Sequence, residues 1–135
     1  MSARATGEFD VTATPLGPYQ TVDGVVFGRL ALAKQFHGDL EGSSTAEMLS
    51  AGSSVKGSAG YVAIERVTGR LHGRAGSFAL QHSGTMTRGR PELMVSVVPD
   101  SGAGELVGLA GRMSIDITDG KHFYAFDYTL PAAGG

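Results

Sequence analysis

The sequence predicts an all-β domain, a sandwich or barrel of eight strands with little helix. Apolar residues recur at every second position in short runs, which is the period of a strand with one buried face. No segment keeps the i, i+3, i+4, i+7 spacing of a helix over three turns. The 21 glycines among 135 residues indicate frequent turns between these runs. A barrel is favoured because it leaves no strand edge exposed.

The first three strands are predicted within the first fifty residues. Residues 7–14 (GEFDVTAT) alternate apolar and polar side chains, as a half-buried strand does. Two prolines make residues 15–24 a loop, because proline is kept out of a central ladder. Residues 25–36 (VVFGRLALAKQF) form the second strand, with a helix as the alternative at 30–35, where good helix formers lie. After a glycine-containing corner, residues 44–50 form a short third strand.

A long hairpin over residues 60–85 supplies the fourth and fifth strands. Its arms, GYVAIERVT and SFALQHSGT, flank a turn with three glycines. Three further strands are predicted at 92–98, 112–118 and 122–130. The last two are joined by Asp119-Gly120, a strong two-residue hairpin signal.

These strands make one domain over residues 7–130. Its length is sufficient to bury a core without metals or cross-links. Residues 1–6 are expected to be flexible, and the glycine-rich tail at 131–135 to be disordered. Residues 106–109 are expected to form one helical turn.

Composition narrows the classes of function. Eleven basic and 13 acidic side chains give a net charge of −2, which argues against a nucleic-acid partner. The absence of cysteine excludes disulfides, a thiol nucleophile and a cysteine metal site, and permits a reducing compartment. The start has no apolar segment typical of a signal peptide, and no run approaches the roughly 18 apolar residues of a membrane span. We therefore expect a cytoplasmic protein without a membrane partner.

Basic residues gather in the sequence around the hairpin turn and the connection after it: Arg66, Arg70, His72, Arg74, Arg88 and Arg90. They could meet an anionic ligand or solvate loops, and solvated loops are the more common case.

A short motif, G-x-L-x-G, occurs at residues 38–42, 69–73 and 104–108. A leucine between two glycines suits a sharp corner, where one apolar side chain plugs the end of a barrel or packs under a loop. The third copy lacks the G-x-G-x-x-G spacing and the GK[ST] ending of phosphate-binding loops. The motif therefore predicts a structural corner.

Glu65 and His82 are the predicted catalytic residues. Because strand residues alternate, one of Glu65 and Arg66 faces the interior, and His82 shares a face with Phe78 and Leu80. A buried carboxylate beside an imidazole could form an ion pair or move a proton to a bound ligand. The alternative is a structural pair that only satisfies its own hydrogen bonds. A shared site requires both side chains on one face of the hairpin.

Five further residues are predicted to line a ligand pocket: Tyr61, Gln81, Tyr124, Phe126 and Tyr128. The phenol groups could hydrogen-bond a ligand carbonyl or alcohol, whereas core packing is the alternative. The four histidines show no H-x-H or H-E-x-x-H spacing, so neither a metal nor a cofactor is predicted.

Two motifs carry a resemblance to a known family. ERVTGRLHGRAGSFALQHSG, residues 65–84, is similar to E-R-x-x-G-x-L-x-G-R-x-G-S-F-x-L-Q-H-x-G. VVPDSGAGELVGLAG matches V-P-x-S-G-T-G-E-L-x-G-L-x-G, with Ala103 in place of the usual threonine. With the terminal YAFDYTL, the chain closely resembles the bacterial family known as domain of unknown function 3224, over about residues 7–130.

The resemblance implies an eight-stranded antiparallel β-barrel like that of allene oxide cyclases and dirigent proteins. It implies no established activity, and no catalytic residue transfers from the cyclases, whose site does not match this chain.

Two hypotheses follow. In the first, the barrel binds an apolar or amphipathic small molecule and isomerises or cyclises it by confinement, since eight strands enclose room for one small ligand. In the second, the barrel is filled by its own side chains and serves as a noncatalytic assembly module. A homo-oligomer, dimer or trimer, is expected because barrel relatives are often oligomeric and the aromatic last strand offers surface to bury.

Overall fold

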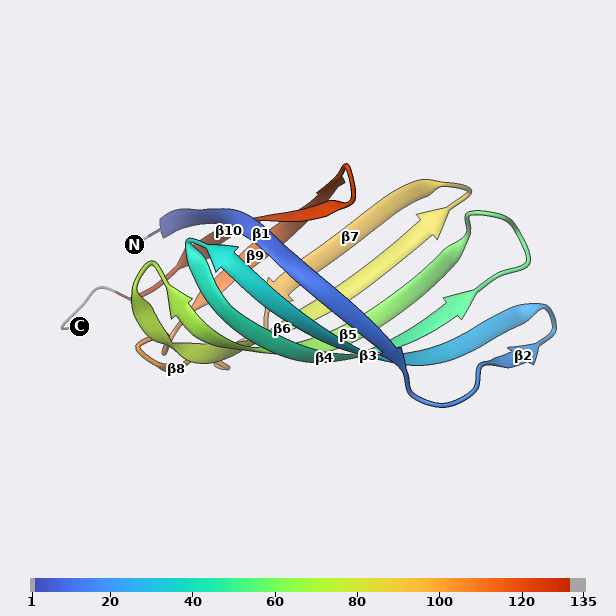
Figure 1. Ribbon diagram of the computed structural model, residues 1–135, viewed down its shortest axis with the longest axis horizontal. Helices are drawn as coiled ribbons and strands as arrows, with labels where there is room; N and C mark the ends of the chain where they lie inside the picture. Colours follow the sequence, from blue (N-terminus) through green and yellow to red (C-terminus); the bar gives the residue numbers. More distant parts are fainter. Residues whose placement is uncertain (1, 132–135) are drawn as a thin grey trace.

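The computed structural model describes residues 2–131 as a closed, eight-stranded antiparallel β-barrel with two extra strands (Figure 1). The strands are β1 (Ser2–Pro15), β2 (Gln20–Val22), β3 (Val25–Gly38), β4 (Leu40–Gly52), β5 (Ala59–Leu71), β6 (Arg74–Thr87), β7 (Arg90–Val97), β8 (Ala103–Gly104), β9 (Ala110–Thr118) and β10 (Lys121–Thr129). Within this range there is no helix, and hence none that could cross a membrane. The predicted fold class is confirmed.

β1 closes the barrel by pairing with two strands in succession. Its first half pairs with β10, from Ser2 opposite Thr129 to Phe9 opposite His122. Its second half runs beside β3, to Pro15 opposite Leu30. β10 therefore lies between β1 and β9, and the aromatic last strand has no exposed edge.

Several local expectations change. Residues 2–6, expected to be flexible, belong to β1 and pair with β10. β3 is a strand throughout, so the helix considered at 30–35 does not form. The helical turn expected at 106–109 is instead a pair of tight turns, in which Leu106 N donates to Ala103 O and Leu109 N to Leu106 O. Most of the tail expected to be disordered, residues 132–135, lies outside the described residues.

Four hairpins turn through two residues that both have positive φ, the second always a glycine. They are Asp23-Gly24, His72-Gly73, Arg88-Gly89 and Asp119-Gly120. Positive φ at both positions is the signature of the type I′ turn, whose twist matches that of the flanking strands. The hairpin predicted at Asp119-Gly120 is confirmed, and the other three make the sheet more regular than predicted.

The three G-x-L-x-G leucines, Leu40, Leu71 and Leu106, are all fully buried in the core. Leu40 and Leu71 are direct cross-strand partners, so they close the same end of the barrel. The glycines allow close approach: a Cβ on Gly69 would stand 2.2 Å from the carbonyl oxygen of Glu41. The structural reading of this motif is confirmed.

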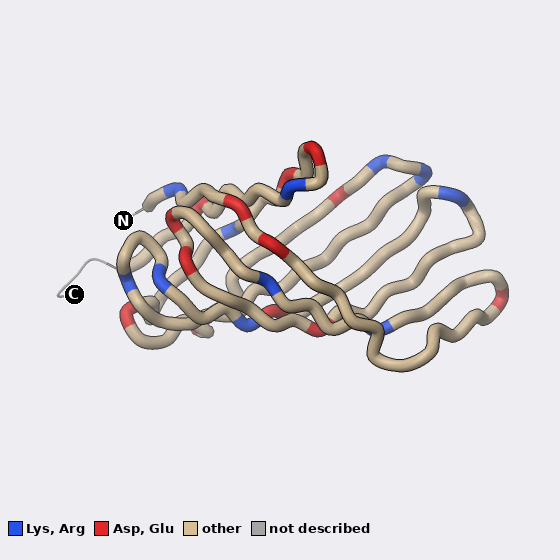
Figure 2. The backbone as a smooth tube through the Cα atoms, viewed as in Figure 1, with Lys and Arg blue, Asp and Glu red and all other residues tan. Residues whose placement is uncertain are grey.

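Charged residues of both signs are scattered along the strands and turns of the backbone (Figure 2). Arg70 and Arg74 flank the β5–β6 turn, whereas Arg88 and Arg90 lie at the β6–β7 turn. These turns cap opposite ends of the 14-residue strand β6, so the arginines that are close in sequence do not form one cluster.

Candidate functional site

Four polar side chains meet inside the barrel, one from each of four consecutive strands. They are Lys34 on β3, Ser44 on β4, Glu65 on β5 and His82 on β6, and all four are buried. Strand alternation directs each of them inward, as it does the neighbouring core residues Phe36, Val67 and Leu80. We call these four residues the interior polar cluster.

Glu65 is the centre of this cluster. Its Oε1 atom lies 2.7 Å from Nε2 of His82 and accepts a hydrogen bond from Nζ of Lys34 at 3.0 Å. Its Oε2 atom accepts a hydrogen bond from the Ser44 hydroxyl at 2.5 Å. The Glu65 side chain has no exposed surface, so these three groups replace the water that a carboxylate normally binds.

The cluster holds Glu65 in its charged form. Burial by itself would raise the pKa of this carboxyl group. The hydrogen bond from His82, the charge of Lys34 and the hydrogen bond from Ser44 outweigh burial and lower the pKa from 4.5 to about 2. Glu65 is therefore a carboxylate at neutral pH, paired with the Lys34 ammonium group.

Two members of the cluster keep unused hydrogen-bonding capacity. An ammonium group has three donors, and the hydrogen bond of Lys34 Nζ goes to Glu65, while its charge also lies 4.8 Å from the centre of the Phe9 ring. Nδ1 of His82 makes no hydrogen bond to any of residues 2–131. The Lys34 and His82 side chains are 7% and 5% exposed, whereas that of Glu65 is 0% exposed.

A split between β7 and β9 lies beside His82. The two strands pair only at Val95 with Met113 and at Ser96 with Arg112, and beyond these pairs they diverge (Figure 1). His82 is the cross-strand partner of Val95, at the start of the split. Further along the two strands, Leu93 and Ile117 have exposed apolar side chains.

The structure brings together the two predicted catalytic residues, Glu65 and His82, on one face of the hairpin. Tyr61 follows the same inward alternation and is half-buried. Burial raises the pKa of Tyr61, and the nearby negative charge of Glu65 raises it further. Tyr61 is the predicted pocket residue most closely associated with the cluster.

Three other predicted pocket residues pack in the core. The Tyr124 hydroxyl accepts a hydrogen bond from Leu40 N at 2.9 Å and donates to backbone oxygens of the β3–β4 corner, including His37 O at 3.0 Å. Phe126 is fully buried, with its ring centre 5.8 Å from that of Phe78. The Tyr128 hydroxyl contacts Nδ1 of His72. The hydroxyl groups of the two tyrosines therefore already have protein partners.

Gln81 lies on the face of β6 opposite to the interior polar cluster. It is exposed on the outside of the barrel, because β6 alternates and its neighbours Leu80 and His82 point inward. There it borders an open groove of about 650 Å³ that is also lined by Val62, Ile64 and His82. Gln81 cannot take part in an interior site from this position.

Sequence reasoning missed Lys34 and Ser44. Lys34 is in phase with Leu30, Leu32 and Phe36 on β3, and a charge within an apolar face is a readable signal. Ser44 offered a weaker signal, since small hydroxyl residues are common on both faces of sheets.

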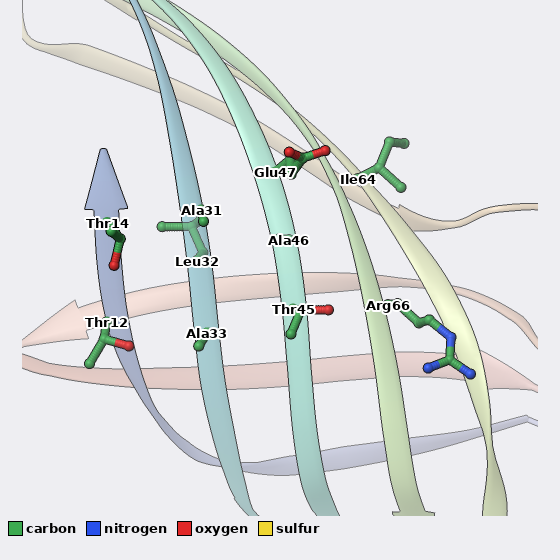
Figure 3. A pocket seen from close by; sticks show the side chains of 10 residues that line it. All are labelled: Thr12, Thr14, Ala31, Leu32, Ala33, Thr45, Ala46, Glu47, Ile64 and Arg66. Atoms are coloured by element: carbon green, nitrogen blue, oxygen red, sulfur yellow. The ribbon is translucent and has the colours of Figure 1, made fainter. Parts of the chain in front are cut away.

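The outer wall carries a second, shallower feature across β1, β3, β4 and β5 (Figure 3). It is an open groove of about 470 Å³ floored by small side chains such as Ala31, Ala33 and Thr45. The Arg66 and Glu47 side chains lie at its edge (Figure 3). Over residues 2–131 no group of three or more His, Cys, Asp or Glu side chains could hold a metal ion.

Comparison with known proteins identifies relatives by family and fold. The family model described as "Protein of unknown function (DUF3224)" matches residues 5–128. A crystal structure of a protein with unknown function from the DUF3224 family of Shewanella oneidensis MR-1 is 54% identical to this chain, with a TM-score of 0.92. The similarity covers 98% of this chain and 100% of that one. No curated protein matches the sequence.

Proposed function

The chain belongs to the DUF3224 family of proteins of unknown function, and from this premise we propose that it binds an apolar or amphipathic small molecule at the interior polar cluster. The binding site would be reached through the split between β7 and β9.

The observation that carries this proposal is a charged pair inside an apolar barrel with donors left over. Burying charged groups costs several kcal/mol of solvation, and replacing such a pair by apolar residues is often neutral or stabilising. Stability alone is therefore a weak reason for Lys34 and Glu65 to lie in the core. The unused donors of Lys34 and the unpaired Nδ1 of His82 support a binding role, and His82 lies beside the split through its cross-strand partner Val95.

The reaction class that we propose is an isomerisation or cyclisation of the confined molecule. The resemblance to the allene oxide cyclase-like barrel supports this class, and the composition of the chain supports a cytoplasmic location. The proposed catalytic residues are Glu65 and His82, with Lys34 as the added cation.

Binding is tested by nuclear magnetic resonance of the protein with 2-decanone, 1-decanol and decanoate as probes. A ligand in the barrel should shift the imidazole signals of His82 and the Nζ signal of Lys34. The matched control is His37, whose side chain is 53% exposed and whose signals should not move. If none of the probes shifts His82 or Lys34, and native mass spectrometry of protein from its host shows no bound molecule, the proposal is wrong.

Assembly is the second candidate function, and a different surface supports it. The predicted surface, the aromatic last strand, offers little to bury, because β10 lies between β1 and β9 and its Tyr124, Phe126 and Tyr128 are buried. Instead, Leu49, Val62 and Ile64 are 52–56% exposed on adjoining positions of β4 and β5. A second copy of the chain could bury them.

Light scattering at several concentrations tests this assembly. A dimer or trimer mass that falls to the monomer mass in Ile64→Lys would support it, because a lysine would be stranded in an apolar interface. A monomer mass for the unmodified protein at every concentration would exclude it.

A further inference from the structure

We infer that the interior polar cluster is arranged for proton transfer at the carbon next to a carbonyl group of an apolar ketone or enone. His82 is the base in this step, and Lys34 donates a hydrogen bond to the carbonyl oxygen. This inference rests on the proposed function and specifies its substrate class.

Glu65 determines which nitrogen of His82 is basic. A carboxylate only accepts hydrogen bonds, so the Nε2 atom of His82, 2.7 Å from Oε1, must carry a hydrogen. In a neutral imidazole the other nitrogen, Nδ1, is then the free base. Nδ1 is also the ring nitrogen without a protein partner among the described residues. Glu65 is thus a positioning residue, and His82 is the group that would touch substrate.

Lys34 supplies the complementary group for the oxygen. Its Nζ atom and the Nε2 atom of His82 contact the same oxygen of Glu65, so the ammonium and the imidazole are neighbours. A carbonyl oxygen bound by a free N–H of Lys34 would bring the adjacent carbon toward the His82 ring. A donor placed where negative charge develops is the main way in which proteins stabilise an enolate.

The charge balance favours a neutral substrate over an anion. The positive charge of Lys34 is already balanced by the negative charge of the Glu65 carboxylate. A ligand carboxylate would place a second negative charge beside Glu65 in an apolar interior, which is costly. Phe9, Phe36 and Val95 around the cluster carry no charge and suit an apolar carbon skeleton.

The step balances without any other reactant. Nδ1 of His82 takes a proton from the α-carbon, and the electron pair of that C–H bond moves to the carbonyl oxygen, which becomes an enolate held by Lys34. The imidazolium then returns a proton. When the proton returns to the same carbon, the result is exchange with solvent hydrogen. When the substrate is an enone and the proton returns to the γ-carbon, the double bond moves, which is an isomerisation.

Exchange is measured directly by following the α-hydrogens of 2-tetralone by proton magnetic resonance in D2O, with and without the protein. The expected result is exchange at least about 100-fold faster than in buffer, the lower range for acid–base catalysis. His82→Asn should reduce exchange to the buffer rate, and Lys34→Met should lower it while the imidazole base remains. His37→Asn, at an exposed histidine, should exchange like the unmodified protein.

The pH profile of the unmodified protein provides a test that does not depend on whether a variant folds. Charged groups face His82 from β5 (Glu65) and β3 (Lys34), whereas its cross-strand partners Ala63 and Val95 carry no charge. The rate should rise with pH and then level off, as it does in general-base catalysis. A rate that does not change with pH, or no acceleration at all, overturns the inference.

The outcomes separate this inference from the proposed function. If 2-decanone or 1-decanol shifts the His82 signals but 2-tetralone does not exchange, the barrel binds ligands and the proton-transfer chemistry is wrong. If no probe shifts those signals and no exchange occurs, both are wrong. Glu65→Gln should reduce exchange and change the pH profile, whereas a merely structural Glu65 would change neither in the protein that remains folded.

Discussion

Lys34 and Glu65 form their ion pair across an intervening strand. Lys34 lies on β3 and Glu65 on β5, with β4 between them, yet Nζ and Oε1 are 3.0 Å apart. The residues of β4 opposite them are Ser44, the partner of Lys34, and Ala46, the partner of Glu65. Their small side chains leave room for the lysine to cross, and Ser44 adds its own hydrogen bond to Glu65.

Removing Lys34 should strongly destabilise the protein. Lys34→Met keeps most of the apolar length of the side chain but leaves Glu65 with a buried charge and no cation. Breaking a buried pair on one side costs about 3 kcal/mol or more. Denaturant unfolding followed by circular dichroism measures the loss.

The matched control is Arg4→Met, which breaks the exposed pair between Arg4 and Asp127, at 2.7 Å. Exposed pairs contribute little because water and salt screen them. Equal losses in the two variants would show that Glu65 does not depend on Lys34.

Acid should remove the contribution of Glu65 over a defined range of pH. Its pKa falls from 4.5 to about 2 on folding, so the folded state is stabilised fully above pH 4.5 and loses this contribution as the pH falls toward 2. The shift corresponds to about 3 kcal/mol. Unfolding free energies at pH 6, 4 and 2 should fall less steeply in Glu65→Gln, and parallel curves would contradict the prediction.

Gly69→Ala should disturb the closed end of the barrel. The new Cβ would lie 2.2 Å from Glu41 O, a backbone atom that can move only with its strand. The expected loss is about 1–3 kcal/mol, as for other overpacked sites. Gly52→Ala is the control, since Gly52 is also a strand residue but a Cβ there meets nothing within 4 Å. Comparable unfolding curves for the two variants would contradict this account.

Tyr124→Phe separates core packing from ligand binding. The change removes the hydroxyl that binds Leu40 N and His37 O, and leaving such backbone groups unpaired costs about 1–3 kcal/mol. Thermal unfolding should show this loss, while the response of His82 to 2-decanone stays unchanged. A variant of normal stability that no longer binds the probe would return Tyr124 to the ligand site.

The fold was largely predictable because strand alternation and turn chemistry act locally. Phe9 and Phe36 lie inside as their period-two patterns indicate, and Asp119-Gly120 makes its predicted hairpin. Asp23-Gly24 lies within residues 15–24, where the two prolines predict a loop, and Arg88-Gly89 lies in the connection between two predicted strands. Each pair nevertheless has the X-Gly composition of a tight hairpin.

The candidate site was only half predictable, because it depends on distant pairing. Glu65 and His82 belong to one hairpin, and its register could be read from a single stretch of sequence. Lys34 joins them only through the curvature of the sheet and the small residues of β4, neither of which a local pattern reveals. Gln81 was placed in the pocket beside His82, although adjacent strand residues face opposite sides.

The position of β1 has a consequence for the order in which the chain folds. Strands β3 to β6 each pair with the next strand along the chain, so they can form hairpins as they are synthesised. The first half of β1 instead needs β10, and Ser2 has no partner until Thr129 has been made. A nascent chain therefore carries a curved sheet with unpaired edges until its last strand emerges, and during that interval it is exposed to pairing with other chains.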